Sequence, residues 1–112
     1  MKVIVEIDAG VCQFYTVACV ICIDGQSVTF DKIETKCEKI NKLGILLKEK
    51  GLIDAYQEIS PKAESIIIQM VRLSLKGGCA GCAVPIGLFK AMQVAAGLAL
   101  PREVSIKFTK ES

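Results

Sequence analysis

Two stretches of β-branched and aromatic residues, separated by Asp24-Gly25, constrain the fold of this chain more than any other feature. The stretches cover residues 14–23 and 26–33. An Asp-Gly pair between two such stretches is a strong signal for a β-hairpin with a two-residue turn. We therefore expect an antiparallel pair of strands at this point. The apolar positions of the second strand are Val28, Phe30 and Ile33.

Two further segments alternate apolar and polar residues and predict strands on either side of this hairpin. In residues 2–8 the alternation places Val3, Val5 and Ile7 on one face and Ile4, Glu6 and Asp8 on the other. In residues 102–109 it places Val104, Ile106 and Phe108 inward. We expect the second of these segments to close the sheet.

Helices are predicted in three places between the strands. Thr35-Lys36-Cys37-Glu38 has the form of a capping box, which puts Cys37 in the first turn of a helix that ends at Gly51. Its core-facing positions are Ile40, Leu43 and Leu47. Residues 52–60 fit a short helix or an extended connection. Pro85 begins the last helix, and Pro101 ends it.

The segment between the second and the last predicted helix fits either a helix or a strand. Ser60-Pro61 resembles a helix cap followed by proline at the first helical position, and predicts a helix to about Leu75. A strand over residues 66–75 fits the same apolar residues. In the helical alternative the inward positions are Ala63, Ile66, Ile67, Met70 and Val71.

A length of 112 residues, of which 52% are hydrophobic, is enough for one core. We expect a single domain over residues 1–112. Its predicted class is α+β, with an antiparallel sheet of three to four strands and three helices packed on one side of it.

Glycines and cysteines gather in residues 76–85, at the start of the last predicted helix. Backbone N–H groups and the helix dipole favour negative charge at a helix start, so we expect Cys79 and Cys82 to have lowered pKa values and to react or bind metal there. The chain contains no histidine, so any metal site must use cysteine or carboxylate ligands. The absence of histidine also removes the usual general base, which favours a binding protein over an enzyme.

The six cysteines fall into two groups by their position. Cys19 and Cys22 lie within a predicted strand, where residues three apart point to opposite faces, so they cannot share a metal. One of them should face the core beside Val17, Ile21 and Ile23. The other four lie at loop exits or helix starts, and they are the predicted ligands: Cys12, Cys37, Cys79 and Cys82.

The order of these elements resembles the U-type iron–sulfur cluster scaffold family, the IscU or NifU N-terminal type. A cysteine precedes a hairpin, a second begins the next helix, and a third opens the last helix, over residues 12–98. Separately, Gly-Gly-Cys-Ala-Gly-Cys followed by Leu88-Phe89-Lys90 is similar to the cluster loop of the NifU-like C-terminal domain. Both resemblances imply iron–sulfur chemistry and a protein partner in cluster delivery. The U-type pattern has an aspartate where this chain has Phe14 and a histidine where it has Gly78.

Three functions remain open on the sequence. The first is binding of an iron–sulfur cluster, or alternatively of structural zinc, whose four sulfurs would lie about 3.8 Å apart given bonds of about 2.3 Å. Lys36, Lys39 and Lys76 could offset the charge of four thiolates. The second is a thiol–disulfide redox protein in which Cys79 attacks and Cys82 resolves. The third is a non-enzymatic interaction module, for which the high apolar content of so small a chain favours a homodimer.

The composition also bears on partners and location. A formal net charge of +2 with dispersed lysines gives no basic stripe, so we expect no nucleic-acid partner. The acids in residues 1–8 do not fit a signal peptide, and free cysteines fit a reducing compartment, so we expect a cytoplasmic protein. Residues 83–100 are nearly long enough to span a membrane, but Lys90 and Gln93 favour a buried core helix and no membrane partner.

Overall fold

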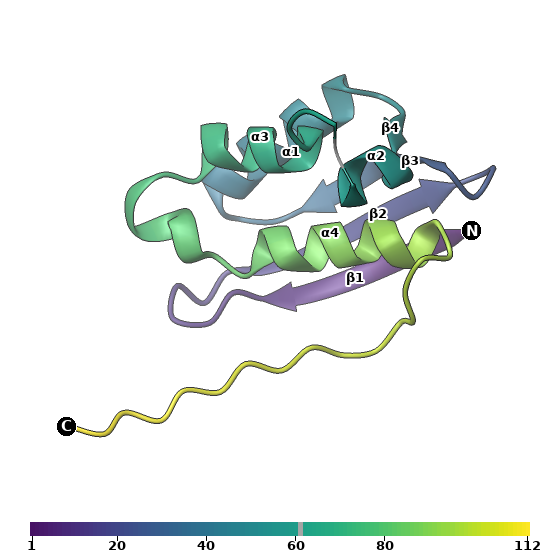
Figure 1. The fold of residues 1–112 in the computed structure, drawn as a ribbon. Helices are drawn as coiled ribbons and strands as arrows, with labels where there is room; N and C mark the ends of the chain where they lie inside the picture. Colours follow the sequence, from purple (N-terminus) through teal and green to yellow (C-terminus); the bar gives the residue numbers. More distant parts are fainter. Residues whose placement is uncertain (61) are drawn as a thin grey trace.

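Four strands form one antiparallel sheet in the computed structural model, which describes residues 1–60 and 62–112. The strands follow one another in the order of the sequence (Figure 1). The predicted antiparallel sheet is therefore confirmed. Its strands are β1 (Lys2–Asp8), β2 (Tyr15–Cys22), β3 (Ser27–Glu34) and β4 (Ile53–Asp54).

The hairpin between β2 and β3 is present, but its turn is longer than expected. Residues 23–26 lie outside both strands, so the prediction of a two-residue turn is wrong. The carboxylate Oδ1 of Asp24 accepts hydrogen bonds from the N–H groups of Gln26, at 3.0 Å, and Ser27, at 2.7 Å. Gly25 has a φ of +76°, a backbone conformation that residues with a Cβ atom rarely adopt. The aspartate side chain thus closes a wider loop than the dipeptide suggested.

A β-bulge in β3 explains how its apolar residues share one face. Cys19 pairs with Lys32 and Val20 pairs with Phe30, so Asp31 is an extra residue without a partner on β2. A bulge shifts the alternation of side chains by one position. Phe30 and Ile33 can therefore both face the helices, although they are three residues apart.

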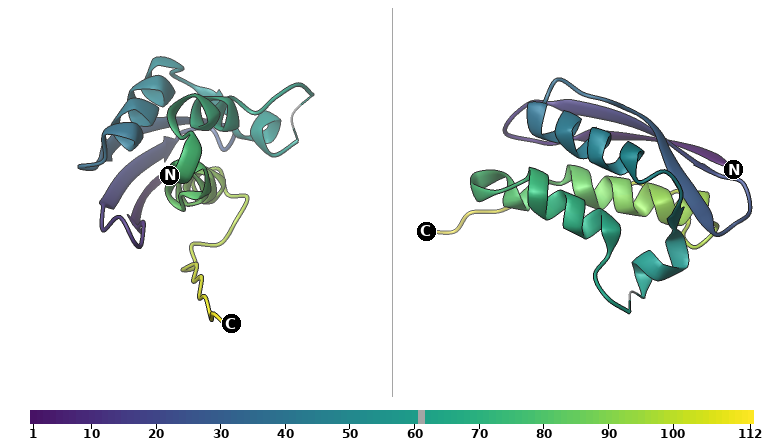
Figure 2. Two further views of the ribbon diagram at one scale, coloured as in Figure 1. Left: turned by 90° about the vertical axis from the view of Figure 1, so that its left-hand side faces the viewer. Right: turned by 90° about the horizontal axis from the view of Figure 1, so that it is seen from above.

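The helices cover one face of the sheet. In the end view of Figure 2 the sheet lies to one side and the helices to the other. α1 packs on β3, α4 packs on β1 and β2, and α3 contacts both helices. This arrangement confirms the α+β class, and the described residues form four α-helices instead of the three expected. They are α1 (Glu38–Glu49), α2 (Ala55–Ile59), α3 (Ile66–Ser74) and α4 (Val84–Ala95), and a 3-10 helix, η1 (Gly77–Gly81), precedes α4.

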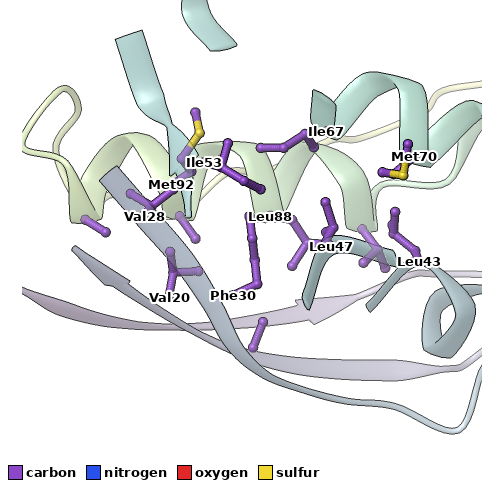
Figure 3. Close-up of a cluster of buried hydrophobic side chains, with 14 of the residues drawn as sticks. Val20, Val28, Phe30, Leu43, Leu47, Ile53, Ile67, Met70, Leu88 and Met92 are labelled. Carbon is purple, nitrogen blue, oxygen red and sulfur yellow. The ribbon is translucent and has the colours of Figure 1, made fainter. Parts of the chain in front are cut away.

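The core lies between the sheet and these helices. Figure 3 shows Phe30 of the sheet close to Leu88 of α4, and both are fully buried. On β2 the core-facing residues are those with even numbers, including Val20 and Cys22, so the expected face with Val17, Ile21 and Ile23 was the wrong one. The core-facing residues of α1 are Ile40, Leu43 and Leu47, as the sequence predicted.

The start of α1 differs from the predicted capping box. Cys37 is the N-cap residue itself, and it makes no side-chain capping bond. The hydroxyl of Thr35 accepts a hydrogen bond of 3.1 Å from the N–H of Cys37, two residues along, and the helix begins at Glu38. Cys37 therefore lies just before the first turn of α1, and its side chain is half-buried there.

The ambiguous segment around residues 66–75 is helical. Its cap is Ser65, whose hydroxyl accepts a hydrogen bond of 3.1 Å from the N–H of Ile68. The predicted start at Ser60 is wrong because Ser60 follows the end of α2, and the predicted role of Pro61 falls outside the described residues. Ala63 is exposed ahead of the helix, whereas Ile67 and Met70 are buried as expected. Residues 52–60 contain both predicted alternatives, a short strand and then a short helix.

The last helix is shorter than predicted. α4 ends at Ala95, and Gly97, with a φ of +76°, turns the chain before Pro101 is reached. Residues 77–95 are long and apolar enough to cross a membrane by length and composition, a test that core helices also pass. In the structure η1 and α4 are separate helices, and α4 packs against the sheet.

Residues 101–112 do not form the predicted closing strand. They leave the body of the molecule as an extended arm (Figure 1), and Val104, Ile106 and Phe108 are 56%, 63% and 89% exposed. The fourth strand of the sheet is β4, which pairs with β3.

Candidate functional site

The four cysteines at loop exits and helix starts lie at one end of the molecule. Cys12 is in the loop between β1 and β2, Cys37 caps α1, and Cys79 and Cys82 lie in and after η1. Figure 1 shows these three segments at its left, and the view from above in Figure 2 agrees. Cys12 is exposed, and the other three thiols are half-buried against the core. The fold thus gathers the predicted ligands from distant parts of the chain.

The environment of Cys82 connects the four thiols electrostatically. Burial raises the pKa of the Cys82 thiol, while a hydrogen bond from the N–H of Val84, the first residue of α4, opposes this rise. Negative charge on Cys12, Cys37 and Cys79 raises the pKa of Cys82 further. The expectation of a lowered pKa is therefore wrong for Cys82, because burial and like charges outweigh the donor at the helix start.

Cys12, Cys37 and Cys79 all contribute charge at Cys82, and they come from three separate segments of the chain. At the same time, no group of three or more cysteine or carboxylate side chains among the described residues lies close enough to hold a single metal ion. The four thiols are thus gathered at one end, with a spacing wider than that of ligands on one ion.

A lysine contacts one of these sulfurs directly. The ammonium Nζ of Lys39, in the first turn of α1, lies 3.3 Å from Sγ of Cys79 and donates a hydrogen bond to it. Of the three lysines that the sequence suggested as counter-charges, Lys39 makes this contact. A cation at this distance stabilises a thiolate and opposes the repulsion among the four sulfurs.

The loop that carries Cys79 and Cys82 is shaped by its glycines. Gly77 has a φ of +69° at the start of η1, and the N–H of Cys82 donates a hydrogen bond of 3.1 Å to the carbonyl of Cys79. Apart from the adjoining residues, a methyl group at Gly78 or Gly81 would meet no atom within 4 Å, so close packing does not require glycine at either position.

The other two cysteines take no part in this site. Cys22 is 1% exposed in the core, and Cys19 is half-buried on the opposite face of β2. This arrangement agrees with the expectation that residues three apart on a strand point to opposite faces.

Glu58 is a buried polar residue that the sequence analysis did not single out. Its carboxylate is 5% exposed and accepts hydrogen bonds from the Ser65 hydroxyl, at 2.7 Å, and from the N–H groups of Ile66 and Ile67, at 2.9 and 2.8 Å. The sequence signal that could have found it is Ser65 directly before an apolar run, which marks a helix start that attracts a carboxylate. Through these hydrogen bonds Glu58 links α2 to the start of α3, which is a structural role.

Comparison with known proteins gives one family. Residues 3–108 match a family of unknown function, DUF6951. Neither the curated proteins nor the solved structures give a match. The match ends at Phe108, so the four cysteines and residues 101–108 of the extended arm lie within the matched region.

Proposed function

The chain belongs to DUF6951, and from its own residues we propose that it binds an iron–sulfur cluster through Cys12, Cys37, Cys79 and Cys82. The observation that carries this proposal is that the segments bearing these four cysteines, far apart in the sequence, meet at one end of the molecule. These residues come from three separate segments, and packing alone does not require cysteine at all four positions. When bound, such a cluster exchanges single electrons or is passed to another protein.

The arrangement of the described side chains does not favour a site for one zinc ion. Four ligands of one zinc ion would lie about 3.8 Å apart. The described residues contain no group of three or more cysteine or carboxylate side chains that could hold a single ion. Cysteine thiolates are also the usual ligands of iron–sulfur clusters, so the donor set fits the group.

Charge balance supports the same proposal and gives Lys39 a role. Four thiolates carry four negative charges, which a cluster only partly neutralises. The ammonium of Lys39 at 3.3 Å from Sγ of Cys79 reduces the remaining charge, and the N–H of Val84 does the same at Cys82. Groups that donate to ligand sulfurs in this way tune the affinity and potential of a metal centre.

A second candidate function is favoured by the difference between Cys79 and Cys82. The ammonium of Lys39 donates a hydrogen bond to Sγ of Cys79 at 3.3 Å, whereas burial raises the pKa of the Cys82 thiol. Two thiols in a Cys-x-x-Cys loop with such different surroundings are typical of a thiol–disulfide redox pair. In that function Cys12 and Cys37 would be dispensable, which separates it from cluster binding.

The test is metal and sulfide analysis of the full chain after anaerobic purification. We expect iron and acid-labile sulfide in the wild-type protein, together with a visible absorption spectrum. Cys12→Ser is the most informative variant because Cys12 is exposed and its replacement leaves the core intact. Loss of most of the iron from Cys12→Ser, and from Cys37→Ser, would support the proposal.

Cys19→Ser is the matched control. Cys19 is a half-buried cysteine outside the site, and this variant should keep its cluster. Zinc without sulfide would replace the cluster by a zinc site, and the absence of both metals from the wild-type protein would overturn metal binding. Disulfide reduction that survives Cys12→Ser and Cys37→Ser would establish the redox function instead.

A further inference from the structure

Residues 101–112, the arm, leave a row of apolar side chains without a covering surface. Val104, Ile106 and Phe108 are each more than half exposed, and they alternate with Glu103, Ser105, Lys107 and Thr109. Such alternation is typical of a strand with one buried face. Both Figure 1 and the end view of Figure 2 show the arm running away from the body of its own chain. The arm therefore has the sequence of a strand but no sheet to join within the described chain.

The sheet, in turn, has an open edge at β1. The described strands pair in the order β1-β2-β3-β4, so the outer side of β1 has no neighbour among them. The main chains of Met1 and Cys22 bond to each other in both directions, and the N–H of Ala9 bonds to the carbonyl of Phe14. Because bonded pairs alternate along antiparallel strands, the even-numbered residues of β1 direct their N–H and C=O groups outward. Exposed edges of this kind favour pairing with another strand.

We propose that the arm of one copy of this chain adds to the β1 edge of a second copy, and that the two copies exchange their arms. The family match extends to Phe108, so the alternating residues 103–108 of the arm lie within the matched region. An exchange of this kind is symmetric, because each copy donates one strand and receives one. The exchange gives a partner to the apolar face of the arm and to the outer edge of β1 at the same contact.

Side-chain complementarity defines the register of this pairing. In a parallel pairing with Val5 beside Ile106, Val3 lies beside Val104 and Ile7 beside Phe108, all on the face that the helices cover. The arm thereby extends the existing core. The apolar face of the arm thus matches the apolar face of β1 at three successive positions.

The charged residues on the other face agree with the same register. Lys2 lies beside Glu103, and Glu6 lies beside Lys107, so both pairs have opposite charge. An antiparallel pairing centred on the same residues would place Asp8 beside Glu103 and leave Glu6 beside Ser105. Like charges in direct opposition destabilise a pair of strands. Charge complementarity therefore favours the parallel arrangement.

Sedimentation equilibrium of the full chain over a concentration series tests the exchange. We expect a dimer for the wild-type protein. Ile106→Asp places a charge on the buried face of both arms and should raise the dissociation constant at least about a hundredfold. Ser105→Asp, the matched control one residue away, adds the same charge on the other face and should leave the dimer intact. A monomeric wild-type protein, or equal effects of the two variants, would overturn the proposal.

A charge exchange then tests whether the pairing is between copies. Glu6→Lys and Lys107→Glu each create like-charge pairs at both contacts of a homodimer, which should raise the dissociation constant about tenfold. In an equimolar mixture of the two variants, both contacts of the mixed dimer regain opposite charges, and its dissociation constant should return to that of the wild type. An arm that pairs with its own chain would be rescued only by the double variant, and that result would refute the exchange. These readouts do not depend on metal, so they stand or fall separately from the proposed cluster.

Discussion

Gly87 of α4 lies directly over Ile7 of β1, with no room for a side chain between them. A Cβ atom built on Gly87 would be 2.5 Å from Cδ1 and 2.7 Å from Cγ1 of Ile7. Since α4 covers β1 at this point, the helix can approach the strand only because residue 87 is glycine. This contact holds the helix that follows the cysteine loop against the strand that precedes Cys12.

We predict that Gly87→Ala destabilises the protein despite the better helix propensity of alanine. The propensity gain is about 1 kcal/mol, and the overlap with Ile7 costs about 1–3 kcal/mol, so the expected net loss is about 1 kcal/mol. Urea unfolding measures it. Adding Ile7→Val removes Cδ1 and should recover part of the loss. Gly81→Ala is the control, because a methyl group there meets no atom within 4 Å; a Gly87→Ala protein as stable as the wild type would contradict the close packing.

We predict that Glu58→Gln lowers the free energy of unfolding by about 1–3 kcal/mol. The carboxylate accepts three hydrogen bonds in a buried place, and an amide can accept only part of them. Glu64→Gln is the matched control, because Glu64 is exposed and its ion pair with Arg72 spans 3.8 Å. Denaturant unfolding of both variants should show a large effect for Glu58 alone, and similar small effects would refute the structural role of its carboxylate.

We predict that Lys39→Met weakens retention of the proposed cluster. The substitution keeps a long side chain but removes the ammonium group that donates to Sγ of Cys79 at 3.3 Å. Loss of a donor next to a metal ligand commonly lowers affinity by about 10–100-fold. The rate of iron release to a chelator is the measurement. Lys36→Met is the matched control, because Lys36 is exposed and lies three residues earlier, and this variant should release iron at the wild-type rate. Equal rates for the wild type and both variants would show that Lys39 does not contribute to the site.

We predict that, in the metal-free protein, alkylation of the Cys82 thiol begins at a higher pH than that of an ordinary cysteine. Burial and then the charges of the neighbouring thiolates raise the pKa of Cys82, so its thiol stays protonated above the pH at which an ordinary cysteine ionises. Because the thiolate is the reactive form, alkylation of Cys82 should begin at a higher pH than that of an unfolded reference peptide. Mass spectrometry of each cysteine after timed iodoacetamide treatment follows this. Replacing Cys12 by serine removes one repelling charge and should move the onset for Cys82 to lower pH, and an unchanged onset would contradict the proximity of the two thiols.

The strands and helices of this protein that were predicted correctly have local signals. Alternation identified both ends of β1, and the spacing of Ile40, Leu43 and Leu47 identified the buried face of α1. The predicted ends of the hairpin turn and the predicted start of α3 were less accurate. The Asp24 side chain closes the hairpin loop and Ser65 caps α3, and in each case other polar residues nearby could have made the equivalent hydrogen bond. The helical type of residues 66–75 followed from packing against α1 and α4, which no local pattern contains.

The sequence by itself determined which cysteines could act together, because loop exits and helix starts differ from strand interiors in the directions that side chains take. Only the tertiary structure decided that Cys12, Cys37 and the pair after α3 lie at the same end of the molecule, since this depends on how the hairpin and three helices pack. The tertiary structure also decided the contact of Lys39 with Cys79 and the burial that raises the pKa of Cys82. In the same way, alternation in residues 102–109 predicted a strand that these residues do not form in the structure, because strand formation requires a sheet edge to join, and alternation does not encode where such an edge lies.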